Sequence, residues 1–537
     1  MRLAMVAAVL VVVAATACTG HPAHSGAPVL AGTTTPSAPL PPTLPAAASS
    51  APVPLPAQLH SPSQPTIVIS EASPEQLSVA VSQTFFTSAP VAIVSALGQA
   101  SITRATAAAE RLGVPLLVAG DAAPAGASAG ASAGSLSARP SAASSGPAPG
   151  DAVRAELRRL GCTDVLTVGN PPALPGVRVT GDAAQLPALA AAAQLHDTTV
   201  LVHAPEDAGT AAAVATAKAA GATVVETRGA DPRADAFTVA ALAAAPTQHV
   251  VALGADFGPA DRLAARVAVA HTGAQLPGGG QLVFPGRRFV ALYGHPGGAA
   301  LGVLGAQDLD ASIARARDLA AQYDGLSDVP VVPTFEIIAT VASGSPGRDG
   351  NYSNESSVES LRPWVEKAVD AGLYVVLDIQ PGRADPLDQA KSYASLLQLP
   401  NVGLAVDPEW ALGAAQKPLE QIGSIDSSKL NEIGAWLDAF TASKHLPQKL
   451  LVLHQFRLSM IGNEAKLKTG YDNVAVLIHM DGQGAPANKD ATWKSVVGAA
   501  PKGLPFGWKN FYKEDHPMLT PEQTMAHAPK PMMISYQ

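Results

Sequence analysis

Eight apolar, strand-like runs follow one another between residues 284 and 537, and this succession restricts the fold more than any other feature of the chain. Helical stretches separate many of these runs. The expected strands cover residues 289–293, 331–336, 374–378, 402–407, 450–454, 474–479, 505–508 and 532–536. The expected helices cover residues 310–323, 357–371, 385–397, 429–443 and 490–497. This pattern predicts a (β/α)8 barrel, a fold that takes roughly 250 residues.

Polar side chains occur where each expected strand ends. They are Tyr293 and His295, Glu336, Asp378 and Gln380, Asp407 with Glu409 and Trp410, His454 and Gln455, His479 and Asp481, Trp508 and Lys509, and Tyr536. Function in such barrels is located at the C-terminal ends of the strands. Because the change from apolar to polar recurs at every strand, we interpret these residues as one site. Each carboxylate taken singly also fits a helix N-cap.

Asp407 and Glu409 are the strongest candidates for catalytic residues in this set. Residues two apart on a strand face the same way, so both side chains are expected to point into the barrel mouth. This D-x-E arrangement at the end of the fourth strand resembles that of chitinase-like and lysozyme-like barrel glycosidases. The resemblance implies that Glu409 is the general acid and that Asp407 assists it. The longer acidic run of a chitinase is absent here.

A glycosidase needs a second carboxyl group across the scissile bond. Asp378 on the neighbouring strand and Asp481 across the barrel are the candidates. The remaining polar and aromatic residues at the strand ends are predicted to bind substrate. Aromatic platforms for sugar rings are expected from Tyr293, Trp410, Trp508 and Tyr536, and hydroxyl or charged substituents are expected to meet His454, Gln455, His479 and Lys509. His295, Glu336 and Gln380 complete the predicted binding residues.

A metal-dependent hydrolase is an alternative built from the same residues. Its ligands would come from His295, Asp378, His454, His479 and Asp481. Barrel enzymes of the amidohydrolase type carry H-x-H at the end of the first strand, whereas this chain has Tyr293, Gly294 and His295 there. We therefore expect no metal and no cofactor. The G-x-S-x-G matches, at residues 126–130 and 130–134, lie in a low-complexity segment and not at the end of an expected strand, so they do not support a serine nucleophile.

Residues 66–280 show a different alternation of short apolar strands and Ala-rich helices, which predicts a Rossmann-like region with a parallel sheet. A low-complexity loop at 121–149 interrupts it. Residues 107–117 and 157–169 resemble the cell wall-binding repeat 2 family, with a helix followed by a Gly-containing turn and a strand in each. The resemblance implies binding to an anionic wall polymer. A generic Rossmann-like layer is the alternative.

The N-terminal residues predict an export signal. Met1 and Arg2 precede an apolar run that ends before Cys18 and is too short for a membrane span of ~20 residues. Residues 15–18, of sequence Ala-Thr-Ala-Cys, resemble a bacterial lipobox. The resemblance implies diacylglycerol on the Cys18 sulfur and cleavage before it. An ordinary signal peptide cut near Ala17 is the alternative.

Residues 19–65 contain mainly Pro, Ala, Ser and Thr, and this composition predicts a disordered tether. The net charge of −8 argues against nucleic acid as a partner. The region from residue 284 onward also resembles actinobacterial lipoproteins of unassigned function, on the phrases at 453–457, 479–484 and 506–512. We therefore expect a lipoprotein on the outer face of the cell membrane whose barrel cleaves envelope polysaccharide. A non-catalytic sugar-binding lipoprotein is the other alternative.

Overall fold

The computed structural model describes residues 56–120, 150–191, 194–203 and 207–537. The expected export signal with Cys18, most of the expected tether and the low-complexity loop lie outside these residues. Within the described ranges, no helix has both the length and the apolar character needed to cross a membrane.

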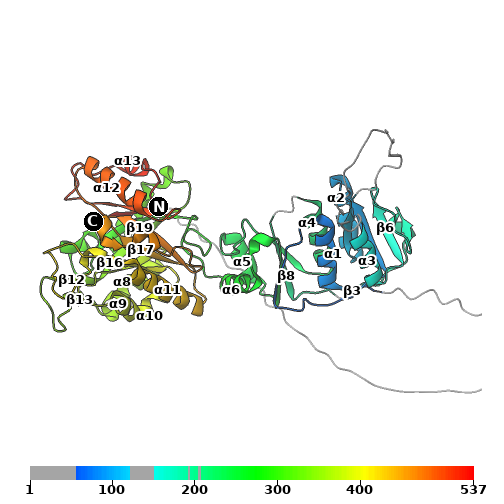
Figure 1. Ribbon diagram of the computed structural model, residues 1–537, viewed down its shortest axis with the longest axis horizontal. Helices are drawn as coiled ribbons and strands as arrows, with labels where there is room; N and C mark the ends of the chain where they lie inside the picture. Colours follow the sequence, from blue (N-terminus) through cyan, green and yellow to red (C-terminus); the bar gives the residue numbers. More distant parts are fainter. Residues whose placement is uncertain (1–55, 121–149, 192–193, 204–206) are drawn as a thin grey trace, which may run out of the picture. The chain divides into compact units, whose positions relative to one another are not determined.

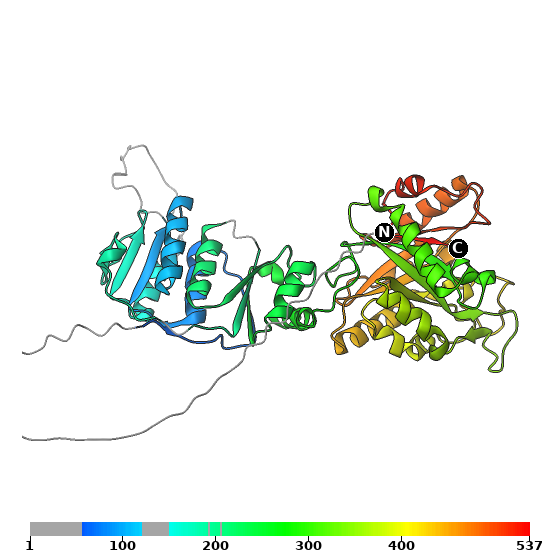
Figure 2. The same ribbon diagram turned by 180° about the vertical axis from the view of Figure 1, so that it is seen from behind.

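Eight parallel strands close into a barrel, as the sequence predicts (Figures 1 and 2). They are β11 (Arg288–Gly294), β12 (Val331–Ala342), β14 (Tyr374–Ile379), β15 (Val402–Val406), β17 (Lys449–His454), β19 (Val474–Met480), β20 (Phe506–Asn510) and β21 (Met533–Tyr536). The first strand, β11, pairs with β12 on one side and with β21 on the other, which closes the ring. A short strand, β13 (Ser353–Glu355), pairs antiparallel with the far end of β12.

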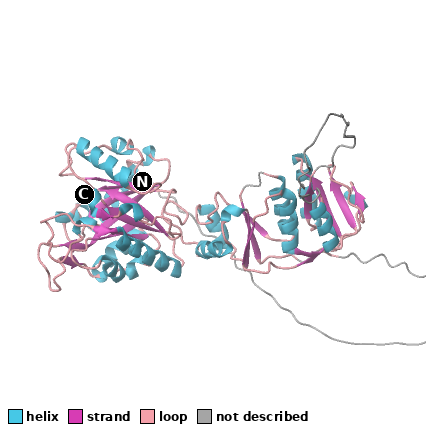
Figure 3. Cartoon of the chain, in the orientation of Figure 1, coloured by secondary structure: helices cyan, strands magenta, loops and turns pink. Residues whose placement is uncertain are grey.

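Helices surround these strands (Figure 3). They are α7 (Leu309–Ala321), α8 (Val358–Asp370), α9 (Pro386–Ser392), α10 (Ala394–Leu397), α11 (Ser427–Ser443), α12 (Pro486–Ala499) and α13 (Pro521–Met525). Side chains of Asp308, Ser357, Asp385 and Asp426 cap four of them, as expected for short polar residues that accept from backbone N–H groups. The stretch predicted as one helix at 385–397 is divided at Tyr393, and the five-residue α13 was not predicted.

The strands place alternate side chains inside and outside the barrel. Inside, Phe289, Tyr374, Leu450, Leu477 and Met533 belong to one apolar cluster, which Leu276 and Val283 join from the preceding segment. Outside, a larger cluster packs the strands against the helices. Because the interior is filled with apolar groups, the next inward residues, at the C-terminal ends of the strands, form a layer supported from beneath.

The region before the barrel contains parallel strands in two separate four-stranded sheets. One has the order β2 (Thr66–Ile69), β10 (His249–Leu253), β8 (Thr198–Val202), β9 (Thr223–Glu226). The other has the order β5 (Leu116–Ala119), β4 (Val91–Ala96), β6 (Asp164–Val168), β7 (Arg178–Thr180). The described helices are α1 (Pro74–Phe85), α2 (Gln99–Leu112), α3 (Asp151–Leu160), α4 (Ala208–Ala219), α5 (Ala236–Ala244) and α6 (Ala260–His271). The predicted parallel pairing is present, whereas one Rossmann-like layer is not.

Candidate functional site

A layer of polar side chains lies above the apolar interior of the barrel. Strand register brings its members to matching heights, because Tyr293 is paired with Glu336, His454 with His479, and Lys509 with Ser535. The layer consists of Tyr293, Glu336, Asp378, Asp407, His454, His479, Asp481, Lys509 and Ser535, all of them buried. The sequence predicted every residue of this layer except Ser535, whose hydroxyl lies 3.3 Å from Nε2 of His479.

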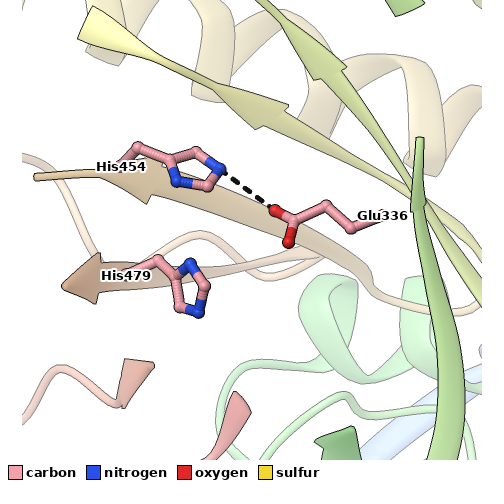
Figure 4. Close-up of side chains that lie close together, drawn as sticks. All are labelled: Glu336, His454 and His479. Carbon is pink, nitrogen blue, oxygen red and sulfur yellow. Dashed lines mark hydrogen bonds and ion pairs between the residues drawn. The ribbon is translucent and has the colours of Figure 1, made fainter. Parts of the chain in front are cut away.

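His454 is the centre of the layer. Its Nδ1 lies 3.0 Å from Oδ2 of Asp481. Its Nε2 lies 3.0 Å from Oε1 of Glu336 (Figure 4). Nε2 is also 3.9 Å from Oδ1 of Asp378. Burial lowers the pKa of His454, but the charges of Glu336 and Asp378 and the two hydrogen bonds outweigh it and raise the pKa well above its usual value. His454 is therefore an imidazolium that donates to two carboxylates.

The carboxyl groups around this imidazolium fall into two classes. Burial raises the pKa values of Glu336 and Asp481, but the charge and hydrogen bonds of His454 bring both below their usual values. Burial raises the pKa of Asp378, and it raises that of Asp407 well above the usual value, with the charge of Asp481 adding to the rise at Asp407. The pKa values of Glu336 and Asp481 are therefore lowered, and those of Asp378 and Asp407 are raised.

Glu409 belongs to neither class. It is half-buried on a short turn, Pro408–Trp410, that follows β15. Burial and the charge of Asp481 raise its pKa to about 7, against the opposing charge of Lys509. Glu409 therefore exchanges its proton near neutral pH, the range in which a general acid works best.

Asp407 and Glu409 do not lie on one strand face, because β15 ends at Val406. Asp407 instead caps the turn, and its Oδ1 accepts a hydrogen bond from the backbone N–H of Glu409 at 3.1 Å. The prediction that both side chains share one strand face is therefore wrong. Both side chains nevertheless line the same cavity.

This cavity has a volume of about 530 Å³ and opens at the mouth of the barrel. Its polar lining includes Tyr293, Gln380, Asp407, Glu409, Asp481 and Lys509. Trp410 lines it as well, together with residues that the sequence did not single out, among them Leu301, Leu419, Phe456 and Phe511. These apolar residues come mostly from loops, where no strand periodicity signals an inward direction.

Four predicted residues belong neither to the buried polar layer nor to the cavity lining. Strand alternation turns Trp508 outward, where its ring lies 5.7 Å from that of Trp493 on α12. Tyr536 also faces outward, with its hydroxyl 2.5 Å from that of Tyr323. The other two are engaged with neighbouring loops. Gln455 donates to Glu464 at 2.9 Å, and His295 lies 3.0 Å from the hydroxyl of Ser356.

The layer also contains the donor types of a metal site. Nitrogen and oxygen atoms of Glu336, His454 and His479 lie within 4.8 Å of one another (Figure 4), as do those of Asp407, His454 and Asp481. Oε2 of Glu336 and Nδ1 of His479 have no hydrogen-bond partner among the described residues. His454 belongs to both groups, and to bind a metal it would have to lose a proton and one of its two carboxylate partners.

Comparisons with known proteins add no assignment. No protein-family model matches the chain, and no curated protein matches it significantly. The barrel and the chemistry of its mouth are therefore the guides to function.

Substituting Asp407 tests the proton assignment of the layer. Above pH ~4 the unfolded chain releases the proton of Asp407 while the folded barrel retains it, so the folded state is penalised by about 1.4 kcal/mol per pH unit until its raised pKa is reached. Asp407→Asn removes this penalty. We expect the free energy of unfolding of the variant, minus that of the wild type, to increase with pH between 4.5 and 7.

Urea unfolding followed by tryptophan fluorescence measures this difference, because all five tryptophans lie in the barrel. Asp318→Asn, at an exposed position on α7, is the matched control for the loss of one carboxylate. A pH-independent difference for Asp407→Asn would contradict the assignment.

Proposed function

We propose that the barrel is a glycoside hydrolase that cleaves envelope polysaccharide. The observation that carries this proposal is the pair Glu409 and Asp481, which line one cavity with pKa values displaced in opposite directions. Two carboxyl groups whose environments separate their pKa values in this way supply an acid and an anion at the same pH. That combination is what cleavage of a glycosidic bond requires.

Each residue then has a distinct role. Glu409 gives its proton to the glycosidic oxygen as the bond between that oxygen and the sugar carbon breaks. Asp481, ionised through its contact with His454, faces the positive charge that develops on the sugar and acts as nucleophile or as base toward water. Trp410 offers an aromatic face at the cavity wall. Asp407 holds a proton and serves as a hydrogen-bond donor to the substrate.

Glu409→Gln should reduce release of sugar from isolated cell envelopes by 10²-fold or more, because proton donation to the leaving group is lost. In the wild type, kcat/KM should fall as pH rises through about 7, where Glu409 loses its proton. Reducing-sugar release across a pH series measures both effects.

Glu359→Gln, exposed on α8, is the matched control and should leave activity unchanged. Full activity in Glu409→Gln would refute the assigned role. Absence of release from every envelope glycan by the wild-type chain would instead favour a sugar-binding lipoprotein.

We further propose that a lipid on Cys18 holds the protein at the outer face of the membrane, with the region at 66–280 positioned to bind wall polymer. The Ala-Thr-Ala-Cys sequence at 15–18 and the Pro-rich segment after it support this proposal. An anchored enzyme meets polymers within reach of the membrane, so an envelope polysaccharide is favoured over a diffusible sugar.

Cys18→Ser should move the protein from the detergent phase to the aqueous phase when expressing bacteria are extracted with detergent. Cys162→Ser is the control, because Cys162 is the other cysteine of the chain and is buried in the α/β region. Membrane retention of Cys18→Ser equal to that of the wild type would argue against the anchor.

A metal-dependent hydrolase is the second candidate, favoured by the two donor groups that share His454. The glycosidase proposal expects wild-type activity to survive exhaustive dialysis against EDTA, with no stoichiometric metal in the purified protein. About one equivalent of a divalent metal, together with loss of activity on chelation and recovery on its return, would establish the second candidate.

A further inference from the structure

Lys509 is a buried cation whose charged end faces the cavity. It lies on β20, is 3% exposed and lines the cavity next to Tyr293 and Phe511. Its Nζ is 3.4 Å from the centre of the Tyr293 ring and 5.4 Å from that of the Phe511 ring. The aromatic faces stabilise the ammonium group by a cation–π interaction but offer no strong hydrogen-bond acceptor.

The other buried lysines of the barrel have oxygen partners. Nζ of Lys449 donates to the carbonyl oxygens of Leu399 and Pro400. Nζ of Lys489 donates to the carbonyl oxygen of Lys509 at 2.6 Å and to the carboxylate of Asp515. Among the described residues, Nζ of Lys509 has no such acceptor, and no carboxylate oxygen lies within 4.0 Å of it. Three N–H donors are therefore available to whatever fills the cavity.

The carboxyl groups of the cavity interact with this charge only from a distance, since Lys509 lowers the pKa values of Asp481 and Glu409 without an ion pair to either. Asp481 already shares its charge with His454 at 3.0 Å. Glu514 also lines the cavity, but it is exposed at the rim. When a ligand displaces water from the cavity, an ammonium group without a counter-ion in direct contact becomes costly to keep there. An anionic oxygen on the ligand removes that cost, whereas a sugar hydroxyl supplies only a neutral acceptor.

We propose that Lys509 binds an anionic substituent of the ligand, so that the cavity selects acidic sugars over their neutral counterparts. This inference extends the proposed function by naming its substrate class, and it concerns binding rather than bond cleavage. The substituent is a carboxylate or a phosphate group carried by the sugar. A charge-assisted hydrogen bond of this kind favours the acidic sugar by about tenfold to a hundredfold in Kd.

Calorimetric titration of the full chain carrying Glu409→Gln tests the proposal without consuming the ligand. The probes are matched pairs: glucuronic acid with glucose, galacturonic acid with galactose, N-acetylmuramic acid with N-acetylglucosamine, and glucose 6-phosphate with glucose. At least one acidic member should bind tenfold or more tightly than its neutral partner. The first three pairs report a carboxylate, and the fourth reports a phosphate.

Lys509→Met should abolish the preference, and Lys509→Arg should retain part of it. Lys502→Met, at an exposed position outside the cavity, should change nothing. Equal affinity for acidic and neutral members in the Glu409→Gln chain would overturn the proposal even if Lys509→Met fails to fold. So would an unchanged preference in folded Lys509→Met, or failure of every acidic sugar to bind.

Failure of the proposed hydrolysis can be distinguished from failure of the proposed role of Lys509. A chain that prefers acidic sugars but releases none from envelopes refutes the glycosidase and leaves the binding site. A chain that cleaves a glycan and binds neutral and acidic sugars equally retains the glycosidase and refutes the role of Lys509.

Discussion

The imidazolium of His454, held between Glu336 and Asp481, determines the charge state of the whole barrel mouth. Two cations, His454 and Lys509, face five buried or half-buried carboxyl groups in this layer and its cavity. Low dielectric surroundings do not tolerate uncompensated charge, so only two carboxyl groups can be ionised together at low cost. The two ionised groups are those that contact His454, namely Glu336 and Asp481. The other three carboxyl groups, Asp378, Asp407 and Glu409, retain protons to higher pH.

The closed ring of strands explains why this cluster could be predicted from the sequence in outline. Each strand is buried on both faces and therefore appears as a short apolar run, and its polar continuation marks the C-terminal end. Which individual residues point into the barrel was harder to predict from the sequence. The run predicted at 505–508 ended on Trp508, whereas β20 extends to Asn510 and turns Lys509 inward. A shift of one residue exchanges the two faces of a strand, so Trp508 and Lys509 cannot both face the cavity.

The sequence could not predict which distant strands pair with each other, for a different physical reason. A strand pattern reports that a segment is buried, but it does not report which strand lies beside it. In the α/β region β2 pairs with β10, which follows it by more than 170 residues, and this pairing helps divide the strands into two sheets. The contact of His454 with Glu336 joins residues 118 positions apart. Only the closed barrel brings those two strands, which β14 and β15 separate, around one interior.

The same geometry explains why Glu409, rather than Asp407 or Asp378, suits the task of proton donor. Asp378 is bound by the Tyr293 hydroxyl at 2.7 Å and does not line the cavity. Asp407 reaches the cavity, but burial raises its pKa well above its usual value, so it holds its proton too firmly to exchange it readily near neutral pH. Glu409 stands beyond the strand on a turn that Asp407 itself caps, half-buried, with a pKa of about 7. Asp407 thus fixes the position of Glu409. Because Asp407 remains neutral, it adds no negative charge that would raise the pKa of Glu409 further.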